Sequence, residues 1–408
     1  MCRSLGLNIG EPRSLFAPIF ANLPAKTCNI ISSALLDIID LYCGVGGLSL
    51  GAARAGFRVA AAVDNDPIAM GSHSKNFPLT KHLTGDVSRL DGDDLLELAG
   101  LRKGQLDGLV GGPPCQGFSR MGKRDPKDGR NNLFVDFFRL VKETEPSFFL
   151  AENVQGILDE PYEQIRKRAL KLVSDEYVLL DPVEVTASDH GAPTTRTRVL
   201  FFGFKKRRFE TLDSTLFETN TSTARITVKD ALKGLPARID PRWLSEETSW
   251  RQVGKMGRGR FADSITGRVP KGVGDPASLE RYENKNEVSG FLATRHDTKV
   301  RERFAQIAQG ETDPVSRAPR LNLDGYCPTL RAGTGKDRGS YQSLRPIHPT
   351  ADRVITPREA ARLQGFPDWF IFHPTKWHSF RQIGNSVSPV VAEQILRSIL
   401  LRMRDTRG

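Results

Sequence analysis

One cysteine stands in a segment whose residue types would hold a thiol at a fixed angle. Cys115 lies within the run Gly-Gly-Pro-Pro-Cys-Gln-Gly-Phe-Ser at 111–119, directly after an apolar stretch at 106–110 that predicts a short buried strand. Open α/β sheets place their chemistry at the carboxyl ends of strands, which is where this cysteine falls. The two prolines stiffen the chain before the thiol, and the two glycines let other groups approach the backbone. A buried structural cysteine is the alternative, but such a residue does not need the stiff Gly-Gly-Pro-Pro segment that precedes Cys115, which we call its mount.

Three more side chains with acid–base or cationic chemistry follow later in the chain. Glu152 begins the run Glu-Asn-Val after a predicted strand at 147–151, and Arg196 and Arg198 stand two residues apart where another strand is predicted to begin. Taken alone, Glu152 could be the neighbour of a helix N-cap, and the arginine pair could be an exposed strand face. Beside a mounted cysteine, the set predicts a site with a nucleophile, a proton donor and a cation.

Alternating strand and helix patterns surround these residues and would position them. Apolar runs predict strands at 35–42, 58–63, 106–110, 147–151, 177–185 and 198–204, a strand end near 83–87, and helices at 48–56 and 132–143. Strands that alternate with helices are typical of a doubly wound parallel sheet. The fold class that we predict is therefore α/β.

The turn after the first predicted strand is rich in glycine. Cys-Gly-Val-Gly-Gly at 43–47 separates this strand from the first helix, and Asp64 and Asn65 follow the second strand. In nucleotide-like cofactor sites, the backbone N–H groups of such a turn face the cofactor and an acid about 20 residues later binds the ribose hydroxyls. A tight turn in any strand–helix unit is the alternative. The pattern does not separate NAD from S-adenosylmethionine.

Charge and cysteine usage limit the class of protein. The 408 residues carry a net charge of +11, and the segment 205–350 holds 27 Lys and Arg against 18 Asp and Glu, which is +9 of that total. A solvated surface is the alternative for any basic run, but an excess confined to one irregular segment favours a surface that faces phosphates. The five cysteines show no CxxC spacing and the histidines no HxxxH pattern, so we expect neither a disulfide framework nor a metal site.

Regular structure is predicted again near the C-terminus. Thr356 and Pro357 have the residue types of an N-cap and a first helical position, so a helix is expected from there through Leu363. A last helix is predicted at 390–403 with its apolar positions facing a core. No apolar run reaches the roughly 18 residues that span a membrane, and no clear signal peptide is present. We therefore expect a cytoplasmic protein without membrane contact.

In this order, the motifs resemble those of the DNA (cytosine-5)-methyltransferases of bacterial restriction–modification systems. The resemblance covers the chain from about Leu36 to its end. It rests on the runs at 40–47, 111–119, 152–154, 196–198, 358–367 and 384–387. Three positions depart from the family's usual residues, because Tyr42 stands for Phe, Asp64 for Glu and Thr194 for Gln.

The resemblance implies a Rossmann-like domain that binds S-adenosylmethionine and a smaller, irregular target-recognition domain. Residues 35–205 would form the catalytic and cofactor-binding domain, residues 206–350 the target-recognition domain, and residues 351–408 would return to the catalytic domain. Residues 1–34 would be an N-terminal extension. The cofactor contacts that the resemblance implies are Tyr42, Gly44, Gly46, Gly47, Asp64, Asn65, Asp86, Val87, Pro113, Leu133, Asn385, Ser386 and Val387.

The resemblance also implies a reaction. Cytosine C5 is a poor nucleophile until a thiolate adds to C6, so Cys115 would be the nucleophile and Glu152 the proton donor to N3. Arg196 and Arg198 would be the cations near O2, with Arg198 the nearer. The target base must leave the duplex to reach the thiol. DNA contacts are expected at Gln116, Ser119, Arg120, Lys123, Arg258, Arg260, Arg331, Lys336 and Arg338.

The partners follow from the same resemblance. A member of this family would act as a monomer on double-stranded DNA, with a cognate restriction endonuclease acting separately. Two alternatives stay open: an RNA (tRNA) cytosine-5 methyltransferase of the same fold, and a catalytically silent DNA-binding regulator. The long segment between Arg198 and Arg358 favours a reader of duplexes. The intact set of cysteine, glutamate and arginine speaks against a silent protein.

Overall fold

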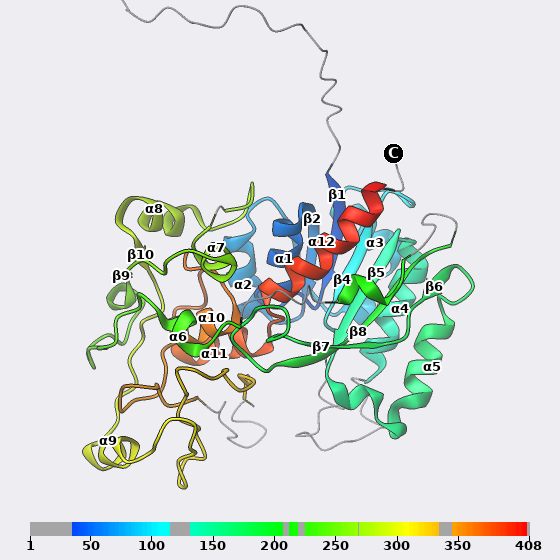
Figure 1. The fold of residues 1–408 in the computed structure, drawn as a ribbon. Coiled ribbons are helices and arrows are strands. Elements are labelled where there is room, and N and C mark those ends of the chain that lie inside the picture. Colours follow the sequence, from blue (N-terminus) through cyan, green and yellow to red (C-terminus); the bar gives the residue numbers. More distant parts are fainter. Residues whose placement is uncertain are drawn as a thin grey trace, which may run out of the picture. The chain divides into compact units, whose positions relative to one another are not determined.

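A computed structural model describes residues 35–114, 131–206, 212–218, 225–267, 269–333 and 345–405. Their central element is a sheet in the order β3–β2–β1–β4–β5–β8–β6, with β7 also paired to β8 (Figure 1). The neighbours β3–β2, β2–β1, β1–β4 and β4–β5 are parallel, and β8 is antiparallel to β5, β6 and β7. The strands are β1 (Leu36–Leu41), β2 (Phe57–Asp64), β3 (Lys81–Thr84), β4 (Gly108–Gly111), β5 (Phe148–Asn153), β6 (Tyr177–Leu179), β7 (Val183–Thr186) and β8 (Thr197–Lys205).

Helices cover both faces of this sheet, as the predicted doubly wound fold requires. On one face, α1 (Gly47–Ala55) and α12 (Pro389–Asp405) share a core with Ile38 and Leu150. On the other face, α3 (Gly92–Ala99), α4 (Asn132–Thr144) and α5 (Glu163–Lys171) pack on Ile39 and Phe149. Alternate residues of one strand therefore serve opposite cores, which confirms the α/β fold class. The helix α2 (Pro67–Asn76) joins β2 to β3.

The prediction of one strand at 177–185 was wrong. Two short strands lie there, and both pair with β8: Tyr177–Leu179 opposes 203–205, and Val183–Thr186 opposes 197–200. Between them, the three residues 180–182 face only the two residues 201 and 202. One residue too many on one side of a ladder interrupts the pairing, and Pro182 has no N–H to donate.

The segment between β8 and α10 is built from short elements that are spaced by long irregular connections. These are α6 (Val228–Leu232), β9 (Arg251–Gln252), α7 (Arg260–Thr266), α8 (Pro276–Lys285), β10 (Glu287–Val288) and α9 (Thr298–Ala305). The described part of the chain also holds short 3-10 turns: η1 (Val87–Arg89), η3 (Gln155–Leu158), η4 (Glu160–Tyr162), η5 (Ser214–Phe217) and η6 (Glu247–Ser249). A sequence with weak periodicity thus gives elements of few residues.

Three helices close the chain, namely α10 (Pro357–Gln364), α11 (Lys376–Asn385) and α12. The predicted start of α10 is confirmed, because the Thr356 side chain accepts from the Glu359 N–H and the Glu359 carboxylate accepts from the Thr356 N–H. Within α10, the fully buried Arg362 forms a double hydrogen bond with Asp368 and donates to the carbonyl of Lys233. These bonds tie the irregular segment to α10. No helix in the described ranges is both long and apolar enough to cross a bilayer.

Candidate active site

The ends of four parallel strands meet at one edge of the sheet. Leu41 pairs with Val63 of β2 and with Gly111 of β4, and Gly111 pairs with Ala151 of β5. The residues at these strand ends, and those that follow them, therefore come together. They include the glycine turn, Asp64, the Pro113–Pro114 run and Glu152, all of which were predicted site residues or their neighbours.

Close neighbours lie against both glycines before the prolines, and at Gly111 they exclude a side chain. A Cβ at Gly111 would lie 2.5 Å from the carbonyl oxygen of Leu41, and a Cβ at Gly112 would lie 3.3 Å from Oε2 of Glu152. The Asn153 amide donates to the Pro113 carbonyl over 3.2 Å, which holds the chain just before the cysteine. Cys115 itself lies outside the described residues. Its mount, however, runs directly past the Glu152 carboxylate.

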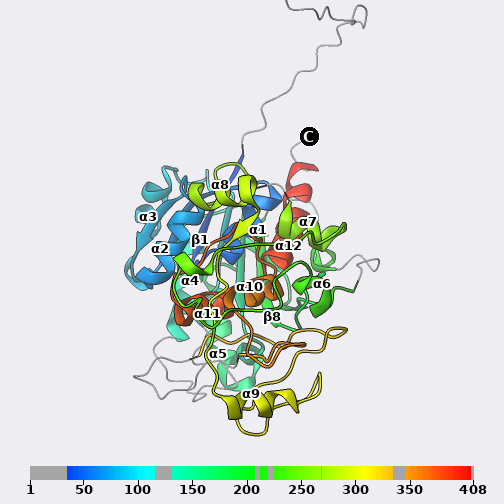
Figure 2. The ribbon, with the colours of Figure 1, turned by 90° about the vertical axis from the view of Figure 1, so that its left-hand side faces the viewer.

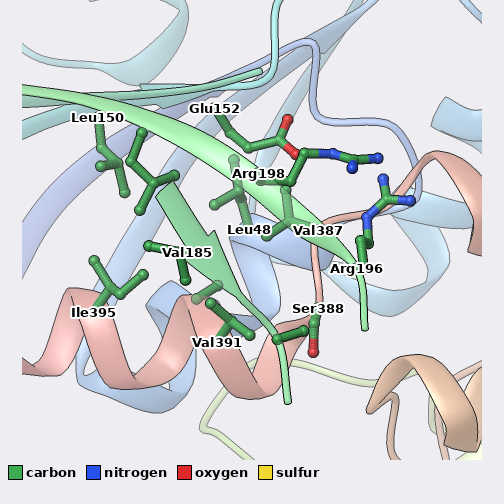
Figure 3. A pocket seen from close by; sticks show the side chains of 13 residues that line it. Leu48, Leu150, Glu152, Val185, Arg196, Arg198, Val387, Ser388, Val391 and Ile395 are labelled. Carbon is green, nitrogen blue, oxygen red and sulfur yellow. The ribbon is translucent and has the colours of Figure 1, made fainter. Parts of the chain in front are cut away.

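Glu152 and Arg198 face each other across β5 and β8. The distance from Arg198 Nε to Glu152 Oε1 is 2.8 Å, and both side chains are mostly buried. They line a small cavity together with Arg196, Ser388 and a group of apolar residues that includes Leu150, Val185 and Leu200 (Figure 3). A carboxylate and a guanidinium held side by side can bind the edge of a flat ring that has both donor and acceptor atoms.

Arg196 makes different contacts from Arg198. Its Nη1 donates to the Gly384 carbonyl over 3.0 Å and to the Leu330 carbonyl over 3.4 Å, and the residue is 5% exposed. Arg196 thus connects the start of β8 with the end of α11 and with the irregular segment. This geometry suits a residue that positions three segments around the site.

The glycine turn is hydrogen-bonded to Asp64, the last residue of β2. Asp64 accepts from the Gly44 N–H over 2.8 Å and from the Asp66 N–H over 2.8 Å. Burial raises the pKa of Asp64, while these backbone donors oppose the rise. Gly44 has φ +55° and open space where a Cβ would point. The turn therefore presents free backbone surface next to a held carboxylate, as a site for a ribose-bearing cofactor needs.

Two other glycines of the turn are crowded. A Cβ at Gly46, which has φ +100°, would lie 2.4 Å from the Phe77 ring. A Cβ at Gly47 would lie 2.3 Å from the Val387 carbonyl oxygen. The predicted C-terminal motif thus lies directly on the glycine turn. In that motif, Asn385 is exposed, and Ser386 donates to the Gln382 carbonyl over 2.7 Å.

Tyr42 and Leu133, which were both predicted as cofactor contacts, are hydrogen-bonded to each other. The Tyr42 hydroxyl donates to the Leu133 carbonyl over 2.9 Å. Tyr42 has φ +56°, an uncommon conformation for a residue with a side chain. Of the other predicted contacts, Val87 is buried and Asn65 exposed, while Asp86 caps η1 by accepting from the Ser88 N–H over 3.0 Å.

Three of the predicted DNA contacts lie among the residues that the structure describes. Arg258, Arg260 and Arg331 are all exposed. Arg260 begins α7, which Figures 1 and 2 both place above α10 and α11, whereas the Arg331 backbone packs against Gly384 at the end of α11. Arg260 and Arg331 thus belong to different parts of the fold, and the DNA contacts stay predictions. The remaining predicted contacts lie outside the described residues: Gln116, Ser119, Arg120, Lys123, Lys336 and Arg338.

A buried polar chain beneath the glycine turn was missed at the level of sequence. Ser49 donates to Asp40 over 2.6 Å, the Ser49 hydroxyl lies 3.0 Å from His73 Nε2, and His73 Nδ1 lies 2.8 Å from His82 Nε2. Burial raises the pKa of Asp40 to about 7. No spacing rule links these residues, because they come from β1, α1, α2 and β3.

The two cysteines that the structure describes are unsuited to nucleophilic chemistry. Cys43 and Cys327 are both buried free thiols. Burial raises the pKa of each thiol above its ordinary value. Because the thiolate is the nucleophilic form, neither can readily take the role assigned to Cys115.

The doubly wound sheet and a cofactor-type turn beside an acid–cation pair define an α/β enzyme of the Rossmann-like methyltransferase class. The chain belongs to the C-5 cytosine-specific DNA methylase family, whose model matches residues 36–401. It is thus a DNA cytosine-5 methyltransferase. Of the alternatives that the sequence leaves open, the comparisons favour the enzyme that acts on DNA.

Several characterised relatives agree with this assignment. The chain is 41% identical to the type II methyltransferase M.XorII of Xanthomonas oryzae pv. oryzae, over 90% of this chain and 85% of that protein. It is 31% identical to M.DdeI of Desulfomicrobium norvegicum, over 89% and 88%. Among solved structures, a proposed DNA modification methyltransferase from an E. coli prophage has 48% identity and a TM-score of 0.81, covering 90% of this chain and 99% of that one. These relatives place the enzyme in the bacterial restriction–modification type.

Proposed function

We propose that the enzyme takes a methyl group from S-adenosylmethionine and transfers it to C5 of a cytosine flipped out of duplex DNA, through a covalent bond between Cys115 and C6. The observation that carries this proposal is the Glu152–Arg198 pair beside the backbone that leads to Cys115. The proton donor and the cation are in contact, and a Cβ at Gly112, just before the two prolines, would lie 3.3 Å from the Glu152 carboxylate.

The proposed roles follow from what each group can exchange with the ring. The Cys115 thiolate adds to C6, Glu152 delivers a proton to N3, and Arg198 donates hydrogen bonds to O2, so electron density moves to C5. After C5 is methylated, a base removes the C5 proton, the bond from sulfur to C6 breaks, and the N3 proton returns to Glu152. The thiolate is thereby regenerated, and no oxidant or reductant is needed.

The residues at the strand ends fit the proposed cofactor. S-adenosylmethionine supplies an electrophilic methyl group on sulfur, together with a ribose and an adenine. The open backbone face at Gly44 lies beside Asp64, whose carboxylate can accept from ribose hydroxyls. Tyr42 and Val87 belong to the apolar cluster on this side of the sheet, and Tyr42 is hydrogen-bonded to Leu133, so these residues can offer surface to an adenine. The same region holds Gly46, Gly47, Asn65, Asp86, Pro113, Asn385, Ser386 and Val387, which we assign to the cofactor site.

We assign residues 35–205 to catalysis and cofactor binding, 206–350 to target recognition and 351–408 to a return into the catalytic part. The excess positive charge of the middle segment supports a DNA-facing role. A cytosine within a duplex cannot reach a buried site, so the base must be flipped. We further propose that the enzyme acts as a monomer in the cytoplasm, with a restriction endonuclease acting separately.

Bisulfite sequencing tests the reaction directly. Plasmid DNA is recovered from a methylation-deficient bacterial host that expresses this chain or its Cys115→Ser variant. We expect protected cytosines in one short recurring sequence, present with the wild type and absent with the variant. Protection by both proteins would exclude Cys115 as the nucleophile. No protection with soluble wild-type protein, followed by labelled-methyl transfer to RNA, would reject the DNA substrate.

A further inference from the structure

Two cations, Arg345 and Lys376, lie at α11 and have no carboxylate partner among the described residues. The Arg345 guanidinium lies over the Phe380 ring, 4.5 Å from its centroid. Lys376 precedes Phe380 by four residues, which puts both on one face of α11. Within the ranges that the structure describes, neither Arg345 nor Lys376 forms an ion pair with a carboxylate. Both side chains are partly exposed and therefore accessible.

The pair is held in place although its members repel each other. Lys376 Nζ donates to the Ala293 carbonyl over 2.7 Å and to the Thr294 hydroxyl over 2.9 Å, which leaves one of its three donors. Arg345 Nε is buried and has no hydrogen-bond partner among the described residues. Burial and the charge of Arg345 lower the pKa of Lys376 to about 8. His296 also lies near Lys376, and burial and the charge of that lysine lower the pKa of His296.

Such an arrangement destabilises the free protein and calls for an anion. Unpaired, partly desolvated cations are unfavourable unless a ligand compensates them. The start of α11 adds to the positive potential, because Thr375 makes no capping bond with its side chain and the first N–H groups of the helix face outward from its end. A singly charged phosphodiester would match one free lysine donor and one guanidinium edge.

The position of the pair fits a strand of bound DNA. α11 leads from Lys376 to Gly384, which accepts from Arg196 and packs against the Arg331 backbone. At 1.5 Å of rise per residue, this distance is about 12 Å. Each DNA strand carries a phosphate about every 3.4 Å along the helix axis. A backbone contact at this distance from Gly384 would lie about three to four phosphates away along one strand.

We propose that Arg345 and Lys376 form a phosphate-binding site for the DNA backbone, which rests on the proposed function. The site reads no base, so it sets the register of the duplex on the enzyme without adding sequence preference. Arg345 is the cleaner test position, because Lys376 also holds the 293–294 segment through its hydrogen bonds.

Duplex affinity as a function of salt concentration tests this site. Fluorescence anisotropy is measured for the wild type, Arg345→Gln, Lys376→Gln and the matched control Arg397→Gln, an exposed arginine on α12 that pairs with Glu393 over 2.6 Å. We expect Arg345→Gln to weaken binding several-fold on cognate and unrelated duplexes alike, and to lower the slope of log affinity against log salt by about one. Arg397→Gln should leave the slope unchanged.

A second measurement locates the phosphate. Neutral methylphosphonates replace the phosphates of the cognate duplex one at a time. The wild type should lose affinity when one particular phosphate is replaced. The affinity of Arg345→Gln should not change when the same phosphate is replaced. Unchanged slope and an unchanged methylphosphonate profile in Arg345→Gln, with normal methylation by the wild type, would overturn the phosphate site alone. A wild type that neither binds nor methylates duplex DNA would overturn both this inference and the proposed function.

Discussion

The carboxylate of Glu152 and the guanidinium of Arg198 lie 2.8 Å apart on adjoining antiparallel strands. Glu152 pairs with Leu200 in the ladder, so Arg198 projects from the same face two residues along β8. Each group limits where the other can point, which prepares them to meet one ring edge together. Preorganised donors of this kind lower a barrier because they need not reorient during the reaction.

Glu152→Gln should lose most of its activity and keep its cofactor. The amide has nearly the size of the carboxyl group but no proton to deliver to N3, and general-acid groups are typically worth about 10²–10⁴-fold in rate. We therefore expect kcat to fall within that range. Calorimetric titration with S-adenosylmethionine should give the wild-type dissociation constant. A kcat within threefold of the wild type would remove Glu152 from the mechanism.

Gly47→Ala should disrupt the contact between the glycine turn and the C-terminal motif. The added methyl group would lie 2.3 Å from the backbone oxygen of Val387, so the backbone must move. Overpacking of this kind typically costs about 1–3 kcal/mol. We expect a lower melting temperature together with weaker binding of S-adenosylmethionine.

Gly71→Ala is the matched control for that variant. Gly71 is an exposed residue within α2, and nothing lies within 4 Å of where its Cβ would be. Because alanine is favoured over glycine in a helix by about 0.5–1 kcal/mol, this substitution should slightly raise stability. If both variants bind the cofactor as the wild type does, the close contact at Gly47 has no functional consequence.

The elements that a local pattern encodes could be predicted. The buried strands of the sheet and the apolar stripe of α4 follow from residue type and period, as does the Thr356 cap of α10. Phe134, Phe137 and Phe138 are indeed fully buried. The Gly-Gly-Pro-Pro segment before Cys115 could also be interpreted, since a glycine is needed at 111, where the Leu41 backbone approaches.

Contacts between distant segments could not be predicted in this way. The Tyr42–Leu133 bond spans 91 residues, and Arg196 reaches Gly384 across 188. A residue type does not tell which distant carbonyl will lie opposite. For the same reason, two features became visible only in the structure. One is the series of polar contacts from Asp40 to His82, and the other is the position of Arg345 at α11, near Lys376. The break at 180–182 depends on a one-residue excess that no period reveals.

Tyr42→Phe should weaken cofactor binding while leaving the chemistry intact. The ring remains, but the hydroxyl no longer fixes Leu133 at its side of the site. A hydrogen bond of this kind contributes about 0.5–1.5 kcal/mol. We expect the KM for S-adenosylmethionine to rise by about two- to tenfold, with kcat at saturating cofactor near the wild-type value.

Tyr177→Phe removes a comparable bond at a remote place. The Tyr177 hydroxyl donates to the Pro146 carbonyl over 2.8 Å in the buried core. This variant should lower the melting temperature and leave the KM for S-adenosylmethionine unchanged. Equal effects of the two variants on KM would mean that the Tyr42 hydroxyl acts only through general stability.

Asp40→Asn should change how stability depends on pH. Burial raises the pKa of Asp40 from 3.8 to about 7, against the hydrogen bond from Ser49, and the charge of Asp64 adds to the rise. Between these two values the folded protein keeps a proton that the unfolded chain has released. The free energy of unfolding must therefore fall as pH rises from about 4 to 7, by up to about 1.4 kcal/mol per pH unit from this group.

The asparagine resembles the protonated acid and cannot ionise. We therefore expect Asp40→Asn to be more stable than the wild type at pH 8, to approach it near pH 4, and to show a flatter profile between them. Urea unfolding at several pH values measures this difference. Because one oxygen of Asp40 is buried without a hydrogen-bond partner, ionisation there is poorly compensated. Parallel profiles for the two proteins would show that Asp40 titrates as an ordinary carboxyl group.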